Sequence, residues 1–178
     1  MDVLYLDLDG VAHPADVWYE RATRQVTLRT PGHELFESMP IFIEAIAPYP
    51  ALHVVLSTSW VRTYGFEQTL EFLPKALQGR VIGATYDASS PDAWRWDRLR
   101  RYDTIALDVL RRQPKRWLAL DDDGIGWPAE EHSALVPVPS ALGLACPLAQ
   151  ELLDFPRFSG QVKVCVLKLF QWCTSVQS

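Results

Sequence analysis

The fold class of this chain is decided by the stretch Val3-Leu4-Tyr5-Leu6-Asp7-Leu8-Asp9-Gly10. Four apolar, strand-forming residues run directly into two aspartates and a glycine, which predicts a buried strand that delivers carboxylates at its carboxyl end. Two later stretches repeat this pattern: His53-Val54-Val55-Leu56 runs into Ser57-Thr58, and Arg116-Trp117-Leu118-Ala119-Leu120 runs into Asp121-Asp122-Asp123. We therefore expect three related strands with polar residues at their ends.

The segments between these strands alternate helical and extended patterns. A β-hairpin over residues 17–29 follows the first aspartates, and the remaining expected elements are helices at 39–47, 66–73, 102–112 and 147–153 and strands at 80–83 and 134–138. Such alternation predicts an α/β fold of three layers, with a mainly parallel sheet covered by helices on both faces.

Composition limits the class of protein. The chain has 178 residues, 48% of them hydrophobic, and a formal net charge of −5, which suits one compact domain. No apolar run is long enough to cross a bilayer, the N-terminus lacks signal-peptide features, and three cysteines contain no C-x-x-C pair. We expect a cytoplasmic protein without a membrane partner. The expected domain spans residues 1–158, and residues 159–178 form a tail whose structure, like the oligomeric state, the sequence does not predict.

The three polar clusters are expected to converge. In parallel α/β sheets, ligands bind at the carboxyl ends of the strands. Alternation along a strand puts Asp7 and Asp9 on one side, where their charges repel unless a cation such as Mg²⁺ binds or one is protonated. Asp121 and Asp122 add oxygen ligands, while Ser57 and Thr58 offer donors to an anion. The pattern predicts a metal beside a phosphate.

These motifs resemble those of the haloacid dehalogenase (HAD) superfamily. Leu4–Val11 is similar to its first motif, D-x-D-G-[VT] after a strand; Val54–Ser57 is similar to the second, and Leu118–Asp122 to the fourth. Their order and separation also agree over about residues 1–155. The resemblance extends to small HAD domains that occur alone or are fused to nucleic-acid repair modules.

The resemblance implies a role for each matching residue. Asp7 would be the nucleophile, Asp9 the general acid and base, and Ser57 a hydrogen-bond donor to the phosphoryl group. Asp7, the main-chain carbonyl of Asp9, and Asp122 would hold Mg²⁺, with Asp121 close by. Further expected site residues are Thr58 and Gly10 at the substrate and, for the single basic residue of the third motif, Arg101, with Arg98, Arg100 and Lys75 as competitors.

The implied function is a Mg²⁺-dependent phosphohydrolase that works through an aspartyl-phosphate. About 47 residues separate Asp9 from Ser57, and a hairpin flap at about 12–32 plus one helix use most of them, so no large cap domain is expected. An open site suits a phosphate on a nucleic-acid end or another macromolecule, although small phosphoesters stay open as substrates. The alternative is a non-catalytic HAD-fold module that binds nucleic acid or protein.

Other features carry two interpretations each. Residues 94–116 contain eight basic and three acidic residues, which indicates either a polyanion-binding segment or, as we favour for most of them, the solvated face of a helix. His13 either shapes the loop after Asp9 or lies at the surface, and the surface is the favoured expectation. Four tryptophans offer either base stacking or, as favoured, packing: Trp60, Trp94, Trp96 and Trp127.

Overall fold

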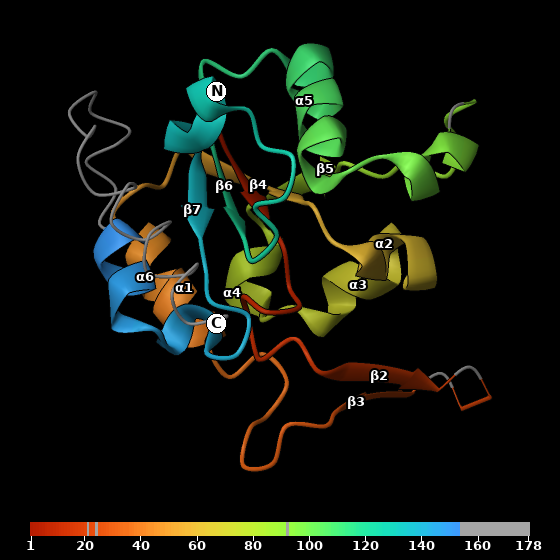
Figure 1. Cartoon of the computed structure of the whole chain (residues 1–178), viewed down its shortest axis with the longest axis vertical. Coiled ribbons are helices and arrows are strands. Elements are labelled where there is room, and N and C mark those ends of the chain that lie inside the picture. Colours follow the sequence, from red (N-terminus) through yellow and green to blue (C-terminus); the bar gives the residue numbers. More distant parts are fainter. Residues whose placement is uncertain (21, 24, 92, 154–178) are drawn as a thin grey trace.

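The computed structural model describes residues 1–153 except residues 21, 24 and 92, so the expected tail lies outside the described residues. Its centre is a five-stranded parallel sheet in the order β5-β4-β1-β6-β7 (Figure 1). The strands are β1 (Asp2–Leu6), β4 (Leu52–Leu56), β5 (Val81–Ala84), β6 (Arg116–Asp121) and β7 (Leu135–Pro137). This confirms the predicted α/β class with a parallel sheet.

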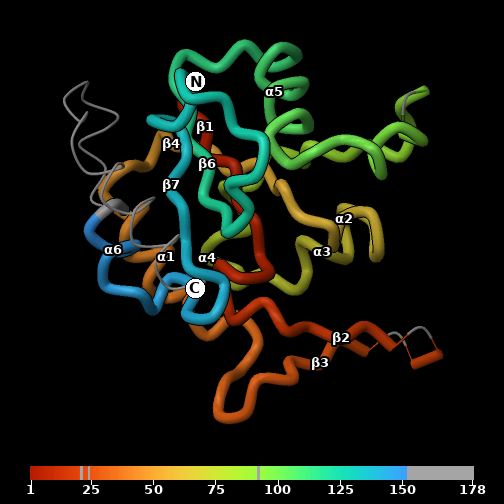
Figure 2. The backbone as a smooth tube through the Cα atoms, in the orientation of Figure 1, coloured from red at the N-terminus to blue at the C-terminus, as the bar shows by residue number. Residues whose placement is uncertain are grey.

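Residues of β1 are buried on both faces, which explains its continuous apolar run. Leu4 and Leu6 belong to one core cluster, together with Phe42 of α1 (Met39–Ile46). The alternate residue Tyr5 belongs to a second cluster on the opposite face, together with Ile105 of α5 (Arg101–Arg112). Figure 2 shows α1 beside α6 (Pro147–Leu153) on one flank of the sheet. The molecule thus has the three predicted layers.

The connection after β4 differs from the prediction of one helix at 66–73. The structure has three short helices there, α2 (Ser59–Tyr64), α3 (Phe66–Phe72) and α4 (Lys75–Gln78). Gly65 separates the first two with φ of +84°, a conformation that glycine adopts without strain. Three 3₁₀ helices were also not predicted, η1 (Ala93–Arg98), η2 (Ala129–Ala134) and η3 (Gly143–Ala145).

The predicted hairpin is present. Strands β2 (Val17–Glu20) and β3 (Gln25–Leu28) pair antiparallel and project from the body of the molecule (Figure 1). Within the described part of residues 9–57, the elements are this hairpin, α1 and β4, which leaves no room for a large cap in that stretch. Among all the described residues, no helix is long and apolar enough to cross a membrane.

Candidate active site

The three polar clusters meet at one edge because their strands are neighbours in register. Leu6, the last residue of β1, pairs with Leu56 on one side and with Leu120 on the other. The ladder continues one step further, since the amide of Asp7 donates to the carbonyl of Leu120 and the amide of Ser57 donates to that of Leu6. The carboxyl ends of these three strands consequently place Asp7, Ser57 and Asp121 side by side.

Asp7 is buried at the centre of this edge. Its Oδ1 accepts a 2.8 Å hydrogen bond from the amide of Leu8, and its Oδ2 accepts one of 2.7 Å from Nη2 of Arg101. Burial raises the pKa of Asp7 to about 6, although the Arg101 charge and the Leu8 amide act in the opposite direction. Each oxygen of this buried carboxylate is therefore held by a donor.

Arg101 is the basic residue that the structure brings to the site. It begins α5, lies with Nε 3.0 Å from Oδ2 of Asp121, and donates to the Ser57 carbonyl as well as to Asp7. One guanidinium therefore joins the ends of three strands.

The other three candidates for that position lie elsewhere. Arg98 lies with its guanidinium carbon 5.6 Å from the ring centre of Trp94, and Arg100 takes part in the capping of α5 with Asp103. Lys75 is exposed on α4. None of the interactions described for these three residues reaches Asp7.

A group of carboxylates suited to a metal lies beside Arg101. Asp7, Asp121 and Asp122 each offer an oxygen, and the three oxygens lie within 4.8 Å of one another. Burial, and next the charge of Asp7, raise the pKa of Asp121 well above its usual value and that of Asp122 to about 7. The carboxylates thus repel one another in a desolvated position.

This donor set fits Mg²⁺. Carboxylate oxygens are the hard ligands that Mg²⁺ prefers, and a divalent cation would offset the repulsion among them. Oδ2 of Asp121 is buried, and although it forms an ion pair with Nε of Arg101, it accepts no hydrogen bond from the described residues, so it retains the capacity to bind a further ligand. The Asp9 carboxylate is not in this group, which is consistent with the expectation that this residue contributes its main-chain carbonyl.

The Asp9 carboxylate has a different environment. Strand β1 ends at Leu6, so regular alternation does not extend to Asp9. Its Oδ1 accepts a 2.8 Å hydrogen bond from the indole Nε1 of Trp60 and lies 3.3 Å from Nε2 of His13. With its side chain 30% exposed, Asp9 is held at one oxygen while part of the carboxyl group remains accessible to solvent.

The expected surface position of His13 is wrong, because the residue is completely buried. Its Nδ1 accepts from the amide of Phe36 at 3.2 Å, which assigns the ring proton to Nε2 and makes His13 a donor to Asp9. Trp60, favoured as a packing residue, does pack against Phe36 and His13, but its N–H also binds Asp9. The sequence signals for this arrangement were the patterns D-x-D-G-V-x-H-P, which contains Asp9 and His13, and S-T-S-W, which ends at Trp60.

The remaining expected site residues lie at the same edge. Ser57 is buried and its Oγ has no hydrogen-bond partner among the described residues, so a donor remains for an anion. Thr58 accepts from the amide of Trp60 as the N-cap of α2, and its hydroxyl also helps to lower the pKa of Asp7. Gly10 has φ of +73°, and an added Cβ would lie 2.2 Å from Oδ2 of Asp122. A glycine is required there for Asp122 to approach the turn.

A cavity of about 300 Å³ opens next to Arg101. Its lining includes Ser59 after the second polar cluster, Asp123 of the third, and Trp96 of η1. This cavity therefore reaches the site at Arg101, between these loops and η1.

Comparison with known proteins gives one result. No curated protein and no solved structure matches the chain. A family model matches residues 3–149, which is most of the described structure, and its description is HAD domain in Swiss Army Knife RNA repair proteins. The predicted HAD resemblance is thereby confirmed, and the chain belongs to this family of HAD domains.

Proposed function

We propose that this protein is a Mg²⁺-dependent phosphohydrolase that acts through an aspartyl-phosphate on Asp7, with a phosphorylated nucleic-acid end as substrate. The observation that carries the proposal is the position of Asp7, buried between Arg101 and the carboxylates of Asp121 and Asp122. Membership of an RNA-repair-associated family supports the substrate class.

In the first half-reaction, a carboxylate oxygen of Asp7 attacks phosphorus and the bond to the leaving oxygen breaks. Arg101 neutralises charge at Asp7, and Ser57 offers its hydroxyl to a phosphoryl oxygen. Mg²⁺ held by Asp7, Asp121, Asp122 and the Asp9 main-chain carbonyl would supply positive charge against the anionic substrate. The leaving oxygen takes its proton from the carboxyl group of Asp9.

In the second half-reaction, the same Asp9 accepts a proton from water as the water attacks phosphorus. The bond between phosphorus and the Asp7 oxygen breaks, inorganic phosphate leaves, and Asp9 again carries the proton. The hydrogen bonds from His13 and Trp60 to one oxygen of Asp9 keep its other oxygen available for these transfers.

The test is hydrolysis of a phosphorylated RNA oligonucleotide and of p-nitrophenyl phosphate, with and without Mg²⁺. We expect Mg²⁺-dependent release of phosphate and, after acid quench, the mass of one phosphoryl group on the peptide that contains Asp7. Asp7→Asn should lower turnover at least about a thousandfold, as expected for loss of a nucleophile. The exposed Asp16→Asn, from the loop after the site, is the matched control and should retain full activity.

Turnover of Asp7→Asn at a tenth of the wild-type rate or better would exclude the aspartyl-phosphate mechanism. Absence of turnover in the wild-type protein, with oligonucleotide binding retained, would instead favour the non-catalytic binding module.

A further inference from the structure

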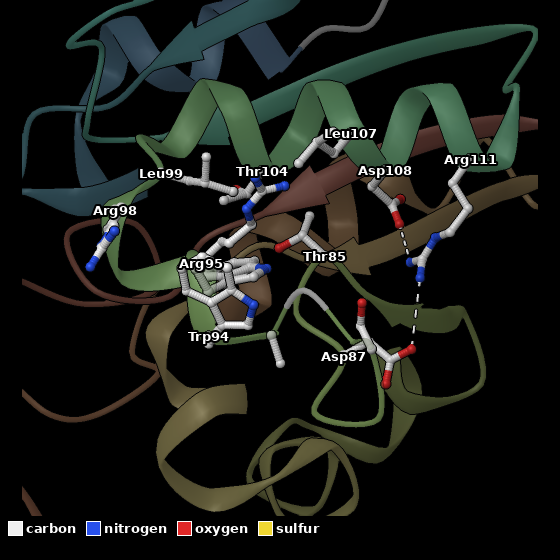
Figure 3. Close-up of a pocket in the computed structure, with 13 residues that line it drawn as sticks. Thr85, Asp87, Trp94, Arg95, Arg98, Leu99, Thr104, Leu107, Asp108 and Arg111 are labelled. Atoms are coloured by element: carbon white, nitrogen blue, oxygen red, sulfur yellow. Dashed lines mark hydrogen bonds and ion pairs between the residues drawn. The ribbon is translucent and has the colours of Figure 1, made fainter.

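A cavity of about 620 Å³ lies between η1 and α5 and is separate from the carboxylates of the active site. Figure 3 shows Leu107, Asp108 and Arg111 of α5 along one wall and Trp94 and Arg95 of η1 along another. The volume lies within the range of about 300–1,000 Å³ that is usual for small-molecule sites. It is sufficient for a nucleotide unit.

The walls combine exposed apolar surface with guanidinium groups. Trp94, favoured as a packing residue, is 62% exposed, and Leu107 is 55% exposed, so both leave apolar surface accessible at the cavity. The guanidinium carbons of Arg95 and Arg98 lie 5.4 and 5.6 Å from the ring centre of Trp94. Both guanidinium groups lie over the indole ring, so a base that stacks on Trp94 would displace one of them, which could then contact the adjoining phosphate.

The cavity adjoins the smaller cavity beside Arg101. Trp96, Leu99 and Thr104 line both cavities, and the second one also includes Arg101. Thr104 lies one turn after Arg101 on α5, and its hydroxyl donates to the Arg101 carbonyl at 2.8 Å. Because Arg101 also donates to Asp7, a strand whose terminal phosphate lies at Asp7 would have the two adjoining cavities near its end.

The charge of the combined lining is opposite to that of the whole chain. Among the described residues, six arginines and four aspartates line the two cavities, whereas the chain carries a net charge of −5. Several of these charges are paired within the protein, Arg111 with Asp108, Arg62 with Asp97, and Arg101 with Asp7. The excess of arginine in the lining favours the binding of an anion on this otherwise acidic chain.

We propose that the cavity between η1 and α5 binds a base and the adjoining phosphate of a nucleic-acid strand, close to the strand end whose phosphate is hydrolysed at Asp7. The proposal rests on the proposed function and adds the residues that select an oligonucleotide over a small phosphoester. Trp94 stacks on the base, Leu107 packs against it, and Arg95 and Arg98 contact the phosphate.

The test measures binding apart from catalysis. RNA hexamers phosphorylated at the 3′ or the 5′ end, with fluorescein at the opposite end, are titrated with the full chain carrying Asp7→Asn, and Kd is read from fluorescence anisotropy. Adding Trp94→Ala should raise Kd at least about fivefold, the lower end for loss of one base stack. Arg98→Gln should also weaken binding and reduce the slope of log K against log salt by about one.

The matched control is Leu110→Ala. Leu110 lies on the same helix and is 68% exposed, but it does not line the cavity, so Kd should stay within about twofold. Melting curves of each variant verify folding, which the exposure of Trp94 leads us to expect.

A cycle with abasic RNA tests stacking directly. Abasic nucleotides are placed one at a time along the hexamer. At one position near the phosphorylated end, the abasic change should weaken binding to the Asp7→Asn protein but not to the protein that also carries Trp94→Ala, because the stack is already lost. Two results would overturn the proposal: an unchanged Kd for the Trp94→Ala protein, or abasic effects that are equal in both proteins at every position. Either result would leave the cavity as a surface for a protein partner.

These outcomes are distinguishable from failure of the proposed function. If the wild-type protein hydrolyses no phosphoester, the function fails while the binding cycle still decides the cavity. If hydrolysis occurs and Trp94→Ala binds RNA normally, the cavity proposal fails alone.

Discussion

Nε2 of His13 lies 3.3 Å from Oδ1 of Asp9, and the imidazole ring is completely buried. Because the Phe36 amide donates to Nδ1, the ring cannot rotate without breaking a buried hydrogen bond. The loop after β1 thus carries both the proposed acid and base and the residue that orients it. His13 touches no reacting atom and is a positioning residue.

Replacing His13 should affect difficult leaving groups most. We expect His13→Ala to lower kcat for an alkyl phosphate about tenfold or more, because a misplaced Asp9 protonates the leaving oxygen poorly. Loss for p-nitrophenyl phosphate should be smaller, since nitrophenolate leaves without a proton, and His13→Gln should restore part of the loss through its amide donor. The exposed His33→Ala is the control. Equal losses for both substrates would indicate general structural damage instead of altered proton transfer.

Arg101 offers a second test, in which activity and stability both respond. Arg101→Ala leaves Asp7 and Asp121 buried without their cation, which should destabilise the fold by about 3–5 kcal/mol and lower activity at least a hundredfold. Arg101→Lys retains the charge but loses the forked donors, so both losses should be smaller. Urea unfolding and kcat/KM measure them. Lys75→Ala, at an exposed position, should change neither stability nor kcat/KM. If Lys75→Ala instead caused losses equal to those of Arg101→Ala, Lys75 and not Arg101 would be the basic residue of the site.

The sheet could be predicted from the sequence because strands that are buried on both faces are apolar at every position. Val3–Leu6 is apolar at every position since Leu4 and Tyr5 enter opposite cores, and the same burial marks β4 and β6. Helix α2 was missed because its N-cap, Thr58, lies inside the polar cluster and its six residues are too few to show periodicity.

The site was less predictable wherever it depends on distant segments. Asp7 and Asp121 could be placed together because both end parallel strands. The burial of His13 could not be predicted, since its partners are the Phe36 amide, 23 residues away, and the ring of Trp60. The exposure of Trp94 depends on the 3₁₀ helix η1, which no pattern in the sequence predicted.

Mg²⁺ should stabilise the folded protein through Asp122. Binding to the native state alone contributes about 2.7 kcal/mol when the free ion is at 100 times its Kd, which thermal unfolding detects as a rise in Tm. Asp122→Asn removes one oxygen of the cluster and should abolish most of that rise. The neighbouring Asp123→Asn, whose carboxylate instead accepts from the Ile125 amide, should retain it. A full response in Asp122→Asn would exclude Asp122 as a ligand.

The metal-free protein should lose stability as pH rises from 5 to 8. The pKa values of Asp7 and Asp122 are raised in the folded state, to about 6 and about 7, above the usual value of 3.8. In this window the folded state binds protons that the unfolded state has released, so the free energy of unfolding falls as pH rises through these two pKa values, and the raised pKa of Asp121 acts in the same direction. Tm measured in a chelator should therefore decrease across the window. Asp122→Asn should make the decrease of Tm with pH smaller, because asparagine does not titrate. Saturating Mg²⁺ should also make it smaller in the wild-type protein, because the cation stabilises the ionised carboxylates. If Tm in the chelator were constant or rose with pH, the raised pKa values of these carboxyl groups, which are caused first by burial, would be disproved.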